Sequence, residues 1–381
     1  MLEHTRTQRN EVAKESDRAM SNKYMTRADA ENSKSSDAFR GRFCPKPFDN
    51  MAIDADGSVR VCCGDWLPTP IGNVRENSLS ALWNSTVAQD IRASILDGTF
   101  RYCDHTTCPA LVKNTLPRRE EVVAQKFDIE TSRTRLPYGP RSIGMGYDNT
   151  CNLKCPTCRP EIIALRGDAL AEAERVQQEV LQLLPEVEFL LITGTGDALA
   201  SHLYRSFLRN FDVQHWPRVR IGLMTNGLLF TPRMWESLRS AHPAIRGISI
   251  SVDAATAATY AVNRGGDFNR LLANLAFAGD LVAAGSLEYF ELSFVVQRNN
   301  FREMPQFVRL GLDLGATAIL FQKLIHWDRT YSREVYLDAA VHRQDHPEHA
   351  EFLETLRSID LADPRVDLSN LADLRASDAI G

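Results

Sequence analysis

Three cysteines lie within eight residues in the segment CNLKCPTC, at Cys151, Cys155 and Cys158. Thiolates are the usual protein ligands of iron-sulfur clusters and frequent ligands of zinc, and most such sites use four ligands. The chain offers no fourth cysteine near this segment. A four-iron cluster with three protein ligands keeps one iron open for a substrate or cofactor, and an open position distinguishes a reactive metal site from a closed one. The spacing therefore favours an open four-iron cluster.

Three alternatives compete with this cluster. A thioredoxin-like redox pair of Cys155 and Cys158 leaves Cys151 without a role. A zinc site needs a fourth ligand, which the neighbouring sequence does not supply. A structural turn with no cofactor is the third alternative, and buried cysteines of that kind behave as small apolar side chains.

The N-terminal part of the chain holds the other five cysteines, Cys44, Cys62, Cys63, Cys103 and Cys108. Short strand-like pieces accompany them, such as NMAIDADGSVRVCC, in which DADG is a hairpin turn signal. In a reducing compartment, clustered cysteines indicate metal or redox chemistry rather than disulfides. Zinc ribbons usually show paired C-x2-C knuckles, which this region lacks, and a zinc-stabilised small domain stays open as an alternative.

Composition excludes several classes of function. The 381 residues are 44% hydrophobic and 24% charged, as in ordinary globular proteins. A net charge of -5 gives no basic face, so we expect no nucleic-acid partner. The N-terminal segment lacks the apolar core of a signal peptide, and no run of about 18 apolar residues predicts a membrane span. We therefore expect a cytoplasmic protein without a membrane partner.

Changes in composition and periodicity divide the chain into four regions. Within the second region a helix is predicted over residues 78–97, with Ser78 as its N-cap and Gly98 as its stop. The regions are a disordered polar tail over 1–40, the cysteine-rich domain over 41–135, an alternating strand and helix pattern over 136–330, and a C-terminal helical extension over 331–381.

Six β-rich runs alternate with helical patterns in the third region. They lie at residues 141–147, 187–193, 220–226, 245–252, 290–296 and 316–322. Such a pattern predicts a parallel sheet covered by helices, either an open doubly wound sheet or a partial barrel. In both architectures ligands bind beyond the C-terminal ends of the strands. The cysteine triplet follows the first of these strands directly, where such a site is expected.

The triplet and its place after the first strand resemble the radical S-adenosylmethionine (SAM) superfamily, over about residues 140–325. The resemblance implies an α/β fold with a partial (β/α)6 TIM-like barrel. It also implies that Cys151, Cys155 and Cys158 hold a [4Fe-4S] cluster whose fourth iron binds the amino and carboxylate groups of SAM. In that family one electron from the cluster cleaves SAM into methionine and a 5'-deoxyadenosyl radical.

The segment TGTGDALAS, after the second strand, resembles the family's Gly-Gly-Glu motif, which holds the SAM amino group. By that resemblance Gly194, Gly196 and Asp197 are SAM-binding residues. The chain departs from the family pattern at two positions. The acidic residue is Asp197 rather than Glu, and Thr157 replaces the aromatic residue that usually precedes the third cysteine.

Three later segments resemble other SAM-binding motifs of the family. LMTNGLL matches a Thr-Asn-Gly turn, which makes Asn226 a candidate polar contact. SISVDAAT resembles a Ser-x-Asp segment, so that Ser251 and Asp253 are candidates for the ribose or the methionine end. In YAVNRGGDF, Arg264 takes the place of an arginine near the SAM carboxylate.

The N-terminal cysteines resemble those of the SPASM and twitch auxiliary-cluster domains. The spacing from the first cysteine through Gly57 to Cys62 fits the family signature, as do the segments IGN and LSALWNS that follow. The resemblance implies an auxiliary [4Fe-4S] cluster, with Cys63 as a spare or alternate ligand. Its four implied ligands are Cys44, Cys62, Cys103 and Cys108.

Together these resemblances imply a radical SAM enzyme that removes hydrogen from a substrate C-H bond. Net oxidation through the auxiliary cluster is the expected outcome, on a peptide, a sugar or an aminocyclitol, with a flavodoxin or ferredoxin as reductant. A non-oxidative epimerase or rearrangement enzyme is the alternative within the same chemistry. A non-catalytic iron-sulfur or zinc protein is the alternative of another class. No residue is identified as a catalytic acid or base.

Overall fold

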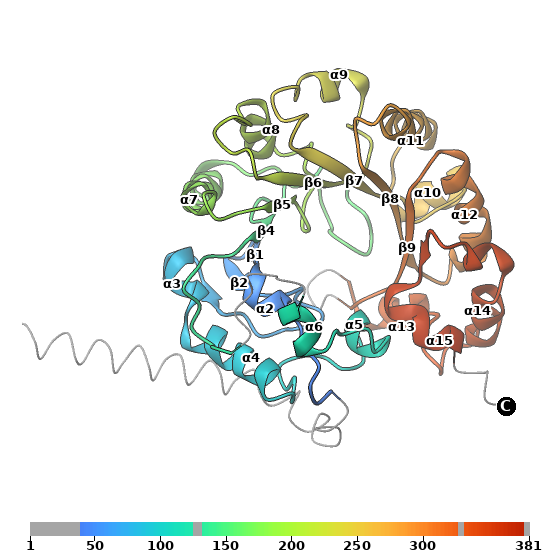
Figure 1. The fold of residues 1–381 in the computed structure, drawn as a ribbon. Coiled ribbons are helices and arrows are strands. Elements are labelled where there is room, and N and C mark those ends of the chain that lie inside the picture. Colours follow the sequence, from blue (N-terminus) through green and yellow to red (C-terminus); the bar gives the residue numbers. More distant parts are fainter. Residues whose placement is uncertain (1–38, 125–131, 327–330, 377–381) are drawn as a thin grey trace, which may run out of the picture. The chain divides into compact units, whose positions relative to one another are not determined.

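A computed structural model describes residues 39–124, 132–326 and 331–376. The expected disordered tail over residues 1–40 lies outside the described residues, apart from its last two positions. The chain divides into two compact units. Unit 1 ends at Gly144 and also includes Arg175–Val187, whereas unit 2 comprises Met145–Glu174 and the chain from Glu188 onward. Figure 1 labels the helices and strands of both units.

Unit 1 contains a small antiparallel sheet and short helices. The DADG segment forms the predicted hairpin turn, because Gly57 has a φ of +83° and β1 pairs with β2 so that Ala52 faces Arg60. A Cβ atom at Gly57 would lie 2.6 Å from the Asn73 side chain, so only glycine fits this turn. The elements are β1 (Asn50–Asp54), β2 (Ser58–Arg60), β3 (Gly72–Asn73), α2 (Lys46–Asp49), α3 (Leu79–Trp83), α4 (Thr86–Leu96), α5 (Pro109–Val112) and α6 (Arg119–Ala124).

The single helix predicted over residues 78–97 is wrong, because two helices, α3 and α4, occupy this stretch. Ser78 caps α3 as expected, but Ser85 caps α4 by accepting a hydrogen bond from Ala88 N at 3.2 Å. The Asn84 side chain between them accepts a hydrogen bond from Leu136 N at 2.9 Å. These local caps compete with a continuous helix and break it at this point. The predicted stop is confirmed, since Gly98 has a φ of +81°.

A buried arginine lies at the centre of unit 1. Arg92 is fully buried, and its guanidinium donates hydrogen bonds to Pro47 O at 2.8 Å, Trp83 O at 2.7 Å and Thr134 O at 3.0 Å. It also lies 4.5 Å from the centre of the Trp83 ring. A buried charge is tolerated only when its donors are satisfied, and here carbonyl groups from separate segments satisfy them.

Unit 2 is built on a parallel sheet, as the sequence predicts. Its strands follow the order β10-β9-β8-β7-β6-β5, and every neighbouring pair is parallel. Helices α8, α9, α11 and α12 lie along one side of these strands (Figure 1). The strands are β5 (Phe189–Ile192), β6 (Arg220–Thr225), β7 (Ile245–Ser251), β8 (Tyr289–Val296), β9 (Ala318–Lys323) and β10 (Val366–Asp367).

The boundary between the two units crosses two elements, β4 (Ser142–Gly146) and α7 (Gly167–Leu183). Each of the six predicted β-rich runs overlaps an observed strand, β4 to β9, and the α/β partial-barrel fold is confirmed. The two-residue β10 was not predicted, because it is too short to leave a periodic signal. The helices of unit 2 are α8 (His202–Arg209), α9 (Pro232–Glu236), α10 (Ala257–Asn263), α11 (Phe268–Ala283), α12 (Met304–Asp313), α13 (Arg333–Ala339), α14 (His349–Leu356) and α15 (Ala372–Ala376).

The strands of unit 2 have buried apolar side chains, and the polar residues of interest lie at the ends of these strands and in the loops that follow them. Ile248, Ile250 and Phe294 are fully buried within their strands, so these strands are covered by apolar contacts. The polar positions of interest begin where strands β5, β6 and β7 end. No helix within the described residues is long and apolar enough to cross a membrane.

Candidate functional site

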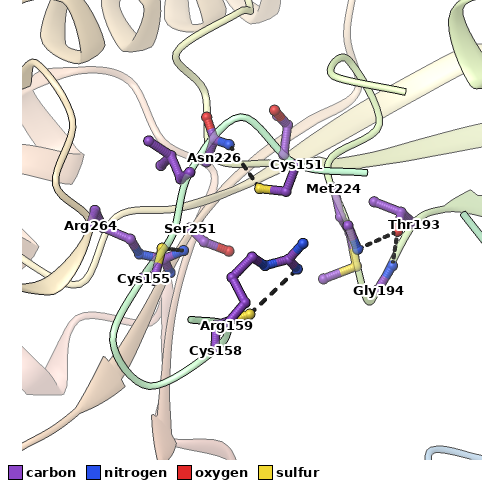
Figure 2. A pocket seen from close by; sticks show the side chains of 13 residues that line it. Cys151, Cys155, Cys158, Arg159, Thr193, Gly194, Met224, Asn226, Ser251 and Arg264 are labelled. Atoms are coloured by element: carbon purple, nitrogen blue, oxygen red, sulfur yellow. Dashed lines mark hydrogen bonds between the residues drawn. The ribbon is translucent and has the colours of Figure 1, made fainter. Parts of the chain in front are cut away.

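The three clustered cysteines line one cavity in unit 2, with a volume of about 80 Å³ (Figure 2). Cys151 and Cys155 are buried, with 7% and 6% of their surface exposed, whereas Cys158 is exposed. The loop turns back at the third cysteine, where Cys158 N donates to Cys155 O at 2.9 Å. Cys151 N donates to Ile163 O at 2.9 Å, which holds the start of the loop against its own later part.

Beyond the cysteine loop, the cavity wall comes from the C-terminal ends of strands β5, β6 and β7 and from the end of helix α10, which follows β7. This is the position predicted for ligand binding from the strand pattern. Of the predicted SAM-binding residues, five line the cavity and two do not. The five are Gly194, Gly196, Asn226, Ser251 and Arg264, joined by Leu153, Arg159, Thr193, Met224 and Thr225, which were not predicted.

Asp197, predicted at the SAM amino group, is fully buried outside the cavity lining. One carboxylate oxygen accepts hydrogen bonds from Leu199 N and Ala200 N, both at 2.9 Å. The other accepts from Thr225 Oγ1 and Asn226 N, both at 2.7 Å. Four protein donors thus occupy this carboxylate, which connects the loop after β5 to the end of β6 rather than facing the cavity.

The two predicted glycines differ in their surroundings. A Cβ atom at Gly196 would lie 2.7 Å from both Asp148 O and Thr150 O, the backbone that leads into Cys151. A Cβ atom at Gly194 would meet nothing within 4 Å. Gly196 therefore lets the loop after β5 pack against the cysteine loop, while Gly194 leaves open space beside the cavity.

Thr193 organises the same loop, and sequence reasoning missed it. Its hydroxyl oxygen accepts hydrogen bonds from Thr195 N at 3.2 Å and Gly196 N at 3.1 Å. It also accepts from Gly194 N (Figure 2). A threonine directly after a strand and before glycines is a signal for such a side-chain turn.

Asn226 lies against the first cysteine. Its side-chain nitrogen is 3.8 Å from Cys151 Sγ (Figure 2). The same nitrogen donates to Asn152 Oδ1 at 2.9 Å. The side-chain oxygen accepts from Leu228 N at 3.1 Å. The residue predicted as a polar contact for SAM thus also holds a cysteine of the triplet.

Asp253 is the second predicted SAM-binding residue that does not line the cavity. It forms an ion pair with Arg264, with 2.6 Å between the Oδ2 and Nη2 atoms, and accepts a hydrogen bond from Val295 N at 2.7 Å. Burial raises the pKa of Asp253, and the Arg264 guanidinium opposes that shift. Arg264 does line the cavity, and its Nη1 atom lies 3.9 Å from Cys155 Sγ (Figure 2).

Arg159, immediately after the third cysteine, was also missed. Only 6% of its surface is exposed. Its Nη1 donates to Asn149 O at 2.7 Å, and its Nη2 donates to Thr195 O. The same Nη2 atom lies 3.5 Å from Cys158 Sγ (Figure 2). The Nε atoms of Arg159 and Arg264 are buried and have no hydrogen-bond partner among the described residues.

Unit 1 brings together the four cysteines implied for the auxiliary cluster. The pKa of Cys44 is raised to about 11, mainly by burial and also by the neighbouring Cys108. The pKa of Cys62 is raised to about 12, mainly by burial and also by the neighbouring Cys44 and Cys108. Burial also raises the pKa of Cys103, on which the other three thiols act as neighbouring charges. Cys63 is instead exposed and lies 3.8 Å from Asp65 Oδ2.

The described residues show no group of three Cys, His, Asp or Glu side chains that converges on a single metal ion. In a four-iron cluster each thiolate binds a different iron, so its ligands need not meet at one point. The donor set in both units consists of thiols, which is the chemistry that iron-sulfur clusters use.

Two protein-family models match this chain. The model described as the iron-sulfur cluster-binding SPASM domain matches residues 44–109. The model of the radical SAM superfamily matches residues 148–284. The matched ranges contain all eight cysteines, and no other cysteine occurs in the chain. A SPASM domain implies auxiliary iron-sulfur binding, and a radical SAM domain implies a [4Fe-4S] cluster and SAM.

Curated and solved proteins resemble parts of the chain. An AdoMet-dependent heme synthase from Methanosarcina barkeri is 27% identical over 186 residues, which cover 47% of this chain and 49% of that protein. The match to Streptococcus suis SuiB has 12% sequence identity and a TM-score of 0.38, and it covers 51% of this chain and 42% of the SuiB chain. The protein anSMEcpe with bound AdoMet and a Cp18Cys peptide is 19% identical with a TM-score of 0.40, over 55% of this chain and 56% of its own.

This chain spans about half the length of the curated relative that it matches. The two family models agree with the two cysteine groups that the structure forms in separate units. The resemblance stated from the motifs is therefore confirmed: the chain carries a radical SAM domain and, on the N-terminal side of it, a SPASM domain.

Proposed function

We propose that this radical SAM enzyme removes a hydrogen atom from a C-H bond of its substrate. The observation that carries the proposal is the set of three thiols, Cys151, Cys155 and Cys158, around one cavity at the strand ends. No other cysteine lines that cavity within the described residues, so a cluster held there keeps one iron open for SAM. When bound, the cluster and SAM supply a 5'-deoxyadenosyl radical by one-electron cleavage of SAM.

The protein groups around the cavity fit SAM in their chemistry. The buried Nε atoms of Arg159 and Arg264 have no partner in the described part of the chain, and a buried donor without an acceptor is costly. A carboxylate in the cavity offers such an acceptor. We assign Arg264 to the methionine end of SAM, with Ser251 and the Gly194 backbone as further polar contacts. Asn226 and Thr193 hold the loops that carry these groups.

We further propose that Cys44, Cys62, Cys103 and Cys108 hold the auxiliary [4Fe-4S] cluster. These four thiols act on one another as neighbouring charges, whereas Cys63 is exposed beside Asp65. Four thiolates leave no iron open, which favours a role in electron transfer over direct substrate binding. The proposed net reaction is oxidation: the substrate loses two electrons and two protons in all, and the auxiliary cluster accepts the second electron.

Only a broad substrate class is proposed. We propose a small molecule or a peptide, with a flavodoxin or ferredoxin as the electron donor. The heme synthase relative does not narrow this choice, since the match covers about half of each chain. A non-oxidative epimerisation or rearrangement is the second candidate, and the mass of the product separates the two. Oxidation removes two hydrogens from the substrate, whereas epimerisation leaves its mass unchanged.

Anaerobic turnover tests the radical chemistry. Protein reconstituted with iron and sulfide is incubated with SAM and dithionite, and 5'-deoxyadenosine is measured. We expect its formation by the native protein and its loss in a Cys155→Ala variant, because one thiolate of the open cluster is removed. A Cys63→Ala variant is the matched control and is expected to behave as the native protein does. Native rates in Cys155→Ala would overturn the assignment.

A further inference from the structure

Two buried arginines lie beside the triplet cysteines, and they differ in how their charge is balanced. Arg264 lies 3.9 Å from Cys155 Sγ, but its guanidinium also forms the 2.6 Å ion pair with Asp253. Arg159 lies 3.5 Å from Cys158 Sγ, and its other hydrogen-bond acceptors are two backbone carbonyls. These carbonyl groups accept from the Nη atoms of Arg159 but do not neutralise its charge, and its Nε has no partner among the described residues.

Arg159 directly follows Cys158, and its Nη2 atom lies 3.5 Å from the Cys158 sulfur. No ion pair joins it to a carboxylate within the described residues, whereas Arg264 and Asp253 together carry no net charge. Since arginine stays protonated in proteins, Arg159 brings a lasting positive charge into the wall of the cavity. With 6% of its surface exposed, that charge is only weakly screened by water.

The reduction potential of an iron-sulfur cluster depends on net charge, hydrogen bonds to its sulfurs and burial. A positive charge and an N-H donor near a thiolate both stabilise the state that has gained an electron. Hydrogen bonds between charged groups are also stronger than those between neutral groups. Arg159 contributes both effects at Cys158. The charge of Arg264 is balanced by Asp253, so Arg264 contributes mainly an N-H group near Cys155.

We propose that Arg159 raises the reduction potential of the cluster held by Cys151, Cys155 and Cys158, and so favours entry of the single electron that SAM cleavage requires. Its role is to tune the cluster through the Cys158 thiolate. The inference rests on the proposed function, because it takes these three cysteines as cluster ligands. Because Arg159 directly follows the third cysteine, its position can be identified in the sequence.

A redox titration followed by electron paramagnetic resonance tests this role. Signals of the open cluster are identified as those that change when SAM is added. At a fixed applied potential, we expect the ratio of reduced to oxidised open cluster to fall about tenfold in Arg159→Gln, which equals a shift of about 59 mV for one electron. Arg159→Lys keeps the charge and is expected to stay much closer to the native protein.

Arg205→Gln provides a matched control. Arg205 also donates to backbone carbonyls, those of Leu199 and Ala200, but does not line the cavity. We expect its removal to leave the potential unchanged. A native potential in an Arg159→Gln protein that retains its iron would overturn the proposal and leave Arg159 as a structural clamp.

If Arg159→Gln does not retain the cluster, Arg159→Lys decides the question. A lysine variant with a near-native potential supports a role for the charge, and one whose ratio of reduced to oxidised cluster falls tenfold contradicts it. Failure of the proposed function looks different, since the native protein would then show no cluster signal that responds to SAM. The two failures are therefore distinguishable in the same titration.

Discussion

The two cysteine groups differ in how the chain assembles them. In unit 2, eight consecutive residues supply three thiols, and other strands supply the polar groups around them. In unit 1, three separate segments supply the four thiols, at Cys44, at Cys62 and at the pair Cys103 and Cys108, so the set exists only when that unit is folded. An open site thus comes from a local motif, whereas a closed site comes from tertiary structure. We expect loss of metal to weaken unit 1 more than unit 2.

Removing the local motif gives the largest expected effect. With two four-iron clusters, the native protein should contain about eight irons, and Cys151, Cys155 and Cys158 replaced together by Ala should leave about four. The remaining cluster should not respond to SAM, because four thiolates leave no open iron. Iron analysis and spectroscopy with and without SAM check this. Zinc in place of the remaining iron would contradict the auxiliary-cluster assignment.

Removing one thiol from unit 1 tests the second of the two cysteine groups. Cys103→Ala should halve the iron content and destabilise unit 1 by about 4 kcal/mol or more, as losses of a metal site commonly do. Thermal unfolding with iron analysis measures both effects. Cys63→Ala is the control, because Cys63 is exposed beside Asp65 and should be dispensable. Equal damage from both variants would place Cys63 in the ligand set.

The two glycines of the β5 loop sharpen the description of the open site. Gly196→Ala should destabilise the protein by about 1–3 kcal/mol and lower the occupancy of the open cluster, because its Cβ would meet Asp148 O and Thr150 O at 2.7 Å. Gly194→Ala should stay within about 0.5 kcal/mol, since nothing lies within 4 Å of its Cβ. Denaturant unfolding and iron content separate the two. Equal effects would show that the loops do not pack as described.

The smallest expected effect concerns the helix break in unit 1. Ser85→Ala should cost about 1 kcal/mol, because Ser85 caps α4 and also donates to Ile71 O at 2.8 Å. Ser78→Ala should cost less, since its capping bond is longer, at 3.4 Å. Thermal denaturation of the two variants measures the difference. A larger loss in Ser78→Ala would favour the continuous helix that sequence alone predicts.

The strand pattern and the cysteine triplet could be predicted from sequence because each is a local signal. The direction of the Asp197 carboxylate could not, since four protein donors compete with any ligand for it, and two of them come from β6 and its loop. Our proposal of Cys62 rather than Cys63 as a cluster ligand also needed the fold, because adjacent side chains leave the backbone in different directions. Arg159 was not predicted, because the cysteine spacing says nothing about the residue after Cys158.

The hydrogen bonds of Arg92 bear on how unit 1 can be cut out of the chain. The matched SPASM region ends at residue 109, but Arg92 donates to Thr134 O and Trp83 Nε1 donates to Tyr138 O at 2.6 Å. A fragment of residues 44–109 would therefore leave a guanidinium donor and an indole donor in a core without acceptors. The packed unit therefore extends beyond its recognisable motif, and we expect a fragment cut at the motif boundary to be unstable.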